Sequence, residues 1–90
     1  MPTIRIPKGY QKFTLQSETF HSTETSFQAI FSQLISAYPA LVGNVFDGSG
    51  KLFPFVRVVE EGAIVNDEDI FEKKVSQSAT IFLINAVAGG

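Results

Sequence analysis

The sequence predicts a small α+β domain in which one amphipathic helix packs on one face of a mixed β-sheet. Strand-like apolar segments stand at both ends of the chain, and a single stretch between them has helical periodicity. No internal repeat or linker divides the chain. Its 90 residues are enough for one domain, and a hydrophobic content of 44% can supply the core.

Two short strands are expected at the N-terminus. Thr3–Ile6 alternates polar and apolar residues, and Gln11–Gln16 alternates again with Phe13 and Leu15 on one face. Pro7–Gly9 between them is typical of a turn, because proline cannot donate to a ladder and glycine tolerates positive φ. The segment therefore predicts a β-hairpin.

The spacing of apolar residues then changes to that of a helix. One stripe is formed by residues at helical intervals, namely Phe27, Ile30, Phe31, Leu34, Ile35 and Tyr38. Ser22, Thr23 and Thr25 are the candidate N-caps. Pro39 ends the helix, because the residue before a proline is driven out of the α region, and it can open a second short helical turn.

Three further strands are expected after a loop at Asp47–Gly50. They cover Phe53–Val59, Ala63–Val65 and Thr80–Ile84, which are rich in β-branched and aromatic residues. The last of them is apolar on both faces, which is typical of a strand in the middle of a sheet. We therefore expect the first and last strands to be adjacent at the centre.

The composition excludes several kinds of site. The chain has no cysteine and a single histidine, His21, so disulfides, a Cys nucleophile and multi-histidine metal sites are excluded. The acidic stretch Asp67–Glu72 lacks the ligand spacing of a calcium loop and is interpreted as a solvated turn. No phosphate-binding glycine motif and no serine–histidine–carboxylate spacing is present. We expect neither a catalytic residue nor a metal.

Charge and hydropathy limit the partners. A net charge of −2 and a pI near 5.2 disfavour a nucleic-acid partner, which calls for a basic stripe. The longest apolar run, Ile81–Ile84, is too short to span a membrane, and Met1–Arg5 lacks the apolar stretch of a secretory signal. These features predict a small soluble cytoplasmic protein without a membrane partner.

The last residues of the chain are small and follow the apolar strand directly. Ala86–Gly90 contains no side chain larger than valine and ends in Gly89 and Gly90. A tail this thin can enter a narrow channel in another protein and present its terminal carboxylate there. We expect a folded domain over residues 1–84 and a flexible tail over residues 85–90.

Together with this tail, three internal blocks resemble the MoaD/ThiS/CysO-type ubiquitin-like sulfur carrier proteins. The blocks are Tyr38-Pro39 at the helix end, Phe55–Val58 in the strand after the loop, and Val65–Ile70, which is similar to a VN(G/D)EDI turn. Two departures blur the subfamily. Asn85 stands where the family commonly has proline, and Glu60–Ile64 looks like an insertion.

The resemblance implies a β-grasp (ubiquitin-like) fold and a carrier protein rather than an enzyme. In the family, an E1-like adenylating enzyme uses Mg-ATP to adenylate the terminal carboxylate, which a sulfur donor converts to a thiocarboxylate. The carrier atom here would belong to Gly90. The residues that would enter the partner's active site are Ala86, Val87, Ala88 and Gly89.

The resemblance also implies a second partner and leaves the pathway open. The sulfur would pass to an accepting enzyme, either cysteine synthase-like or molybdopterin synthase large subunit-like, in cysteine or other sulfur metabolism or in molybdopterin biosynthesis. Chain length favours the MoaD or CysO type. No tightly bound cofactor is implied, because Mg-ATP is used by the activating enzyme.

Strand alternation predicts the surface that partners would contact. If the helix-side residues of each strand face inward, the opposite face carries an apolar patch beside two arginines: Arg5, Phe55, Arg57, Val59, Phe82 and Ile84. An exposed apolar patch on a small soluble protein usually marks a binding site. The alternative is that the loop at residues 47–52, or Ile64, covers Phe55 or Phe82.

Two other functions are compatible with the same residues. The chain could be a ubiquitin-like modifier that is joined through Gly90 to a lysine of a target protein. It could also be a β-grasp interaction domain whose tail is inert and whose function resides in the face around Phe55 and Phe82.

Overall fold

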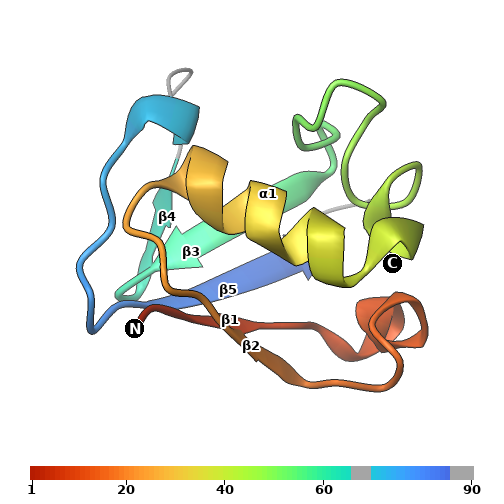
Figure 1. Ribbon diagram of the computed structural model, residues 1–90, viewed down its shortest axis with the longest axis horizontal. Helices are drawn as coiled ribbons and strands as arrows, with labels where there is room; N and C mark the ends of the chain where they lie inside the picture. The colour runs from red at the N-terminus through yellow and green to blue at the C-terminus, as the bar shows by residue number, and fades with distance from the viewer. Residues whose placement is uncertain (66–69, 86–90) are drawn as a thin grey trace.

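The centre of the molecule is a five-stranded mixed sheet in the order β2-β1-β5-β3-β4 (Figure 1). The computed structural model describes residues 1–65 and 70–85. The strands are β1 (Thr3–Arg5), β2 (Thr19–His21), β3 (Val56–Glu60), β4 (Ala63–Val65) and β5 (Thr80–Asn85). β1 and β5 run parallel, and the other neighbouring pairs are antiparallel. The expected central pairing of the first and last strands is confirmed.

One helix, α1 (Phe27–Ala37), crosses one face of this sheet (Figure 1). Its buried stripe is the predicted one, and it shares a core with the inward residues of β1, β3 and β5. The Phe31 ring also packs on Phe46, with 5.2 Å between centroids. The helix ends before Pro39, which begins the 3-10 turn η2 (Pro39–Leu41), so both predictions about this proline are confirmed.

α1 begins at a different N-cap from those expected, which were Ser22, Thr23 and Thr25. The cap is Ser26, whose Oγ accepts a hydrogen bond of 3.2 Å from the Ala29 N–H. Ser22 is instead buried and donates to Gln33 Oε1 at 2.6 Å. Its hydroxyl is therefore used in a tertiary contact, which the local sequence does not reveal.

The second strand of the N-terminal hairpin is also not the expected one. The prediction of a strand at Gln11–Gln16 is wrong, because the 3-10 helix η1 (Lys8–Phe13) takes up its first half. Tyr10 and Phe13 are three positions apart, so a helical turn packs both against the core, whereas a strand would separate them onto opposite faces. β1 pairs with β2 instead.

β3 starts later than predicted, at Val56 rather than Phe53. Pro54 has no N–H for a ladder, and the Phe53 N–H donates to the Val45 carbonyl at 3.1 Å within the preceding loop. That loop contributes Val45 and Phe46 to the core. The aromatic residues before Pro54 therefore belong to the loop.

The segment that begins at Ile70 closes the core at the start of α1. It contains the 3-10 turn η3 (Ile70–Glu72) and the buried Val75. The Phe27 N–H donates to the Lys73 carbonyl at 3.1 Å, and the Val75 N–H donates to the Thr25 carbonyl at 2.7 Å. Among residues 1–65 and 70–85, no helix has both the length and the apolar character needed to cross a membrane.

Candidate interaction face and C-terminal tail

The central strand β5 leads directly into the C-terminal tail. Its last residue, Asn85, pairs with Val56 of β3, one residue beyond the predicted end of the strand. The tail residues expected to enter a partner and to carry the reactive carboxylate lie outside the described residues, namely Ala86, Val87, Ala88, Gly89 and Gly90. The structure therefore fixes where the tail begins, at the β3 side of the sheet centre.

The face of the sheet away from α1 is apolar at its centre. On β5, Ile81 and Leu83 are buried under the helix, whereas Phe82 is 42% exposed and Ile84 is similarly exposed. On β3, Val56 and Val58 are buried in the same way. The alternation used to predict this face is thus present on both central strands.

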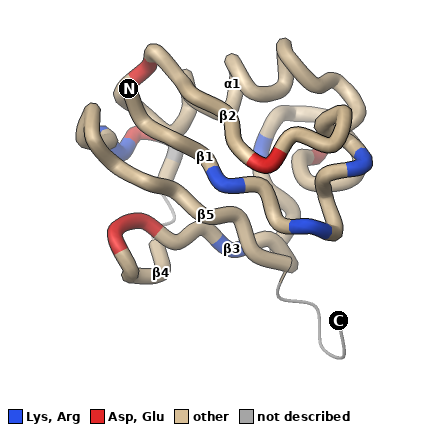
Figure 2. The backbone as a smooth tube through the Cα atoms, turned by 90° about the horizontal axis from the view of Figure 1, so that it is seen from below, with Lys and Arg blue, Asp and Glu red and all other residues tan. Residues whose placement is uncertain are grey.

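The strand register brings the predicted face residues together in two rows. In one row Phe82 lies opposite Arg5 of β1 on one side and Val59 of β3 on the other. In the next row Ile84 lies opposite Arg57. Figure 2 shows the basic positions of β1 and β3 on either side of β5, which has no charged residue. The face is therefore an apolar strip with an arginine on each flank.

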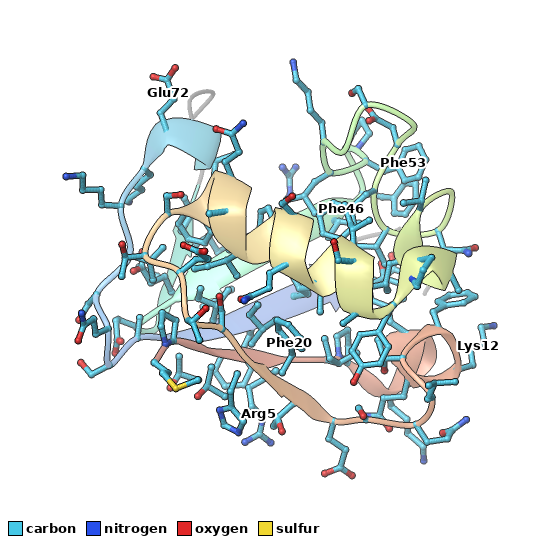
Figure 3. The ribbon with its side chains drawn as sticks, in the orientation of Figure 1. Arg5, Lys12, Phe20, Phe46, Phe53 and Glu72 are labelled. Carbon is cyan, nitrogen blue, oxygen red and sulfur yellow. The ribbon has the colours of Figure 1, made fainter. Side chains whose placement is uncertain are left out.

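Arg5 contacts the apolar strip through its guanidinium. Its Cζ lies 5.9 Å from the centroid of the Phe82 ring, within the range of a cation–π interaction. Figure 3 shows Arg5 on the side of β1 away from α1, whereas Phe46 lies beside the helix. The aromatic ring thus holds the arginine over the sheet.

Phe55, which was predicted to belong to this face, lies in the turn just before β3 and outside the strand register. Its ring stacks on that of Phe53, with centroids 5.3 Å apart and an interplanar angle of 12°. Both Phe55 and Phe82 are exposed, so the alternative that a loop or Ile64 covers them is wrong. Phe53, three residues beyond the loop at Asp47–Gly50, supports Phe55 from the side and does not cover it.

Ile64 belongs to this face, although the sequence reasoning did not include it. It lies opposite Val59 across the β3–β4 pair and is 58% exposed. It therefore extends the row that contains Arg5 and Phe82 as far as the edge strand. Alternation along Ala63–Val65 would have found it, because the middle residue of that strand must face away from α1.

The β2 side of the face is polar. His21 is exposed, and its Nδ1 lies 3.1 Å from Thr3 Oγ1 across the β1–β2 pair. Thr19, which is on β2 like His21, lies opposite Arg5 of β1. The apolar strip therefore stops at β1 and extends toward β4.

Groups with a shifted pKa lie away from this face. Burial raises the pKa of Tyr10 in the core. The pKa of Asp47 is lowered, mainly because its carboxylate accepts hydrogen bonds from the Ser49 hydroxyl and from the Lys51 and Ser49 N–H groups. Within residues 1–65 and 70–85, no cluster of three acidic, histidine or cysteine side chains could hold a metal ion.

Comparisons with solved structures identify the arrangement of strands and helix. CysO in the Amycolatopsis orientalis BexX/CysO complex superposes with a TM-score of 0.84 at 21% identity, covering 100% of both chains. The chain has the β-grasp fold. Mycobacterium tuberculosis CysO gives a TM-score of 0.81 at 20% identity, covering 97% of this chain and 100% of that one.

A second group of β-grasp structures is equally complete in coverage. SAMP1 from Haloferax volcanii superposes with a TM-score of 0.76 at 18% identity, over 99% of this chain and 98% of that chain. No family model matches the sequence, and no curated protein does. The β-grasp fold that the sequence resemblance implied is thus confirmed, and the similar structures are small proteins of the CysO and SAMP1 types.

Proposed function

We propose that this chain is a sulfur carrier protein whose Gly90 carboxylate is adenylated and then converted to a thiocarboxylate. The observation that carries the proposal is the combination of a full-length β-grasp fold similar to CysO with a tail that follows the central strand at once. Ala86–Gly90 is narrow enough to reach an active site that the folded domain cannot enter.

The chemistry requires activation because a carboxylate is a poor electrophile. An E1-like enzyme transfers AMP from Mg-ATP to a Gly90 carboxylate oxygen and releases pyrophosphate. A sulfide equivalent then attacks the acyl carbon, the C–O bond to AMP breaks, and AMP leaves. The product carries sulfur in place of one oxygen, with no change in oxidation state at carbon. The Mg-ATP belongs to the activating enzyme, and this chain holds no cofactor of its own.

The carrier needs two partners in turn, and we assign both to the face around Phe82. The first is the E1-like adenylating enzyme, and the second is an enzyme that accepts the sulfur. In one similar structure CysO is in complex with BexX, which supports a partner enzyme of the second kind. Cysteine, another sulfur metabolite or molybdopterin is the product of the pathway, and we place this chemistry in the cytoplasm.

Intact-mass spectrometry tests the proposal. The full chain is incubated with the E1-like enzyme of the same organism, Mg-ATP and sulfide, and we expect a mass shift that matches replacement of one oxygen by sulfur. A chain without Gly90 is the matched control and should show no shift, because the folded domain is unchanged. Absence of the shift in the full chain, with every E1-like enzyme of the organism, would refute the carrier function.

A second candidate is a ubiquitin-like protein modifier. It is favoured by the likeness to SAMP1, which is named a small archaeal modifier protein. In that function the Gly90 adenylate reacts with a lysine ε-amine of a target, forming an isopeptide bond and releasing AMP. Immunoblots of cells that express the tagged chain would show high-mass conjugates that are lost without Gly89 and Gly90. Thiocarboxylate without conjugates would favour the carrier.

A further inference from the structure

The apolar strip on β5 is flanked by two arginines that do not lie side by side. Arg5 stands on β1 in the row of Phe82, and Arg57 stands on β3 in the row of Ile84. Both are exposed. Strand spacing across β5 and two residues along it put their Cα atoms about 12 Å apart. A partner must therefore meet two separated positive charges with an apolar centre between them.

Phe82 prepares Arg5 for this contact. The guanidinium lies 5.9 Å from the ring centroid, so its position over the sheet is restrained before a partner arrives. A guanidinium next to an aromatic ring can still donate hydrogen bonds through its N–H groups, which are matched to a carboxylate. Less side-chain entropy is then lost on binding than for a solvated arginine.

The surroundings favour carboxylates on a protein over phosphates on a nucleic acid. Two isolated arginines beside Ile64 and Val59 do not make the continuous basic stripe that a phosphate backbone needs, and the chain is acidic overall. The apolar centre instead matches an aliphatic or aromatic side chain of a protein partner.

We infer that the partner docks an apolar residue against Phe82 and Ile84, with one carboxylate for Arg5 and another for Arg57. This inference rests on the proposed function for the identity of that partner, the E1-like adenylating enzyme. The two carboxylates fix the rotation of this chain on the enzyme. Because β5 ends beside Arg57, that rotation also sets the direction in which the tail leaves the interface.

Binding measurements with charge-neutral variants test the inference. The full-length Arg5→Gln and Arg57→Gln chains are titrated with the E1-like enzyme at low and high salt, with Lys12→Gln and Lys74→Gln as controls. The two lysines are exposed and lie in η1 and in the segment after η3. We expect each arginine variant to bind about two- to fivefold more weakly at low salt. The loss should shrink at high salt, and the lysine variants should stay close to wild type.

A double-mutant cycle tests the role of Phe82 as the positioning residue. Phe82→Leu keeps an apolar side chain but removes the ring, so Arg5→Gln should weaken binding less in that background than in the wild type. The Arg57→Gln effect should be the same in both backgrounds. Far-UV circular dichroism of every variant shows that the fold is retained.

The outcomes separate this inference from the proposed function. If the wild-type chain is thiocarboxylated but the arginine variants bind like the lysine variants, the two-carboxylate partner is wrong and the carrier function stands. If the wild-type chain is neither bound nor modified, the carrier function fails, and the inference fails with it. Equal Arg5→Gln effects in both Phe82 backgrounds would refute the positioning role.

Discussion

Phe82 and Leu83 are neighbours on the central strand but face opposite sides of the sheet, so the same substitution should have very different effects at the two positions. Threonine suits the comparison because it is polar and still favours a strand. Leu83 is 2% exposed and belongs to the core under α1, whereas Phe82 is 42% exposed.

The magnitudes follow from what each side chain buries. Leu83→Thr loses a buried apolar side chain and places a hydroxyl in an apolar core, which together cost about 3–5 kcal/mol of unfolding free energy. Phe82→Thr loses roughly half of an aromatic side chain's burial and the contact with Arg5, about 1–1.5 kcal/mol. A domain of this size has on the order of 5–13 kcal/mol in total, so Phe82→Thr keeps most of the stability, whereas Leu83→Thr removes a large part of it.

Urea unfolding followed by far-UV circular dichroism measures both values. Leu83→Thr should lower the midpoint about three times as far as Phe82→Thr, with an unchanged slope. Thermal midpoints should fall by roughly 15–30 °C and 5–10 °C respectively. Equal losses at the two positions would contradict the assignment of faces, and with it the candidate interaction surface.

Three further predictions concern the fold around the site. Ser26→Ala should cost about 1 kcal/mol in urea unfolding, because the Ala29 N–H loses its cap; a loss as small as that of an exposed control such as Ser32→Ala would show that the cap is not used. Leu15→Gly should raise stability by up to about 1 kcal/mol, because Leu15 has a φ of 53° and is 83% exposed; a decrease would contradict the left-handed turn. The pKa of Asp47 is below its ordinary value of 3.8 in the folded protein, so its stabilising contribution is complete above that value and is lost as pH falls through the lower folded-state pKa. The thermal unfolding midpoint should therefore decrease less steeply from neutral to acidic pH for Asp47→Asn than for the wild type. Identical slopes for the two proteins would refute the role of the Asp47 hydrogen bonds.

The helix and the faces of the central strands were predictable because each is set by a long or strong local pattern. α1 carries about three turns of apolar spacing and a proline just beyond its end. β5 is apolar on both faces, which predicts a central position in the sheet. There its inward side is buried under α1, and Phe82 on the other side lies between neighbouring strands. These patterns predicted which side of the central strands faces α1 and which side is exposed.

The N-terminal segment was not predictable in the same way. Phe13 and Leu15 alternate like strand residues, but Tyr10 and Phe13 satisfy a helical turn equally well, and only the tertiary core decides between the two. The strand that does form, Thr19–His21, is short and carries two polar residues, so it depends on pairing with β1. Short elements that are stabilised mainly by their neighbours leave little signal in the sequence.

The parallel pairing of β1 with β5 links the C-terminal strand to the completion of folding. Thr3 pairs with Thr80, so the two ends of the domain must meet before the sheet has a centre, and this gives the fold contacts of long sequence separation. During synthesis the core stays open until β5 has emerged. A chain that is cut short before β5, or damaged so that β5 cannot insert, lacks the central strand of the exposed face that includes Phe82 and Ile84. In the proposed carrier function, an activating enzyme that contacts both this face and the C-terminal residues would therefore select intact molecules without a separate proofreading step.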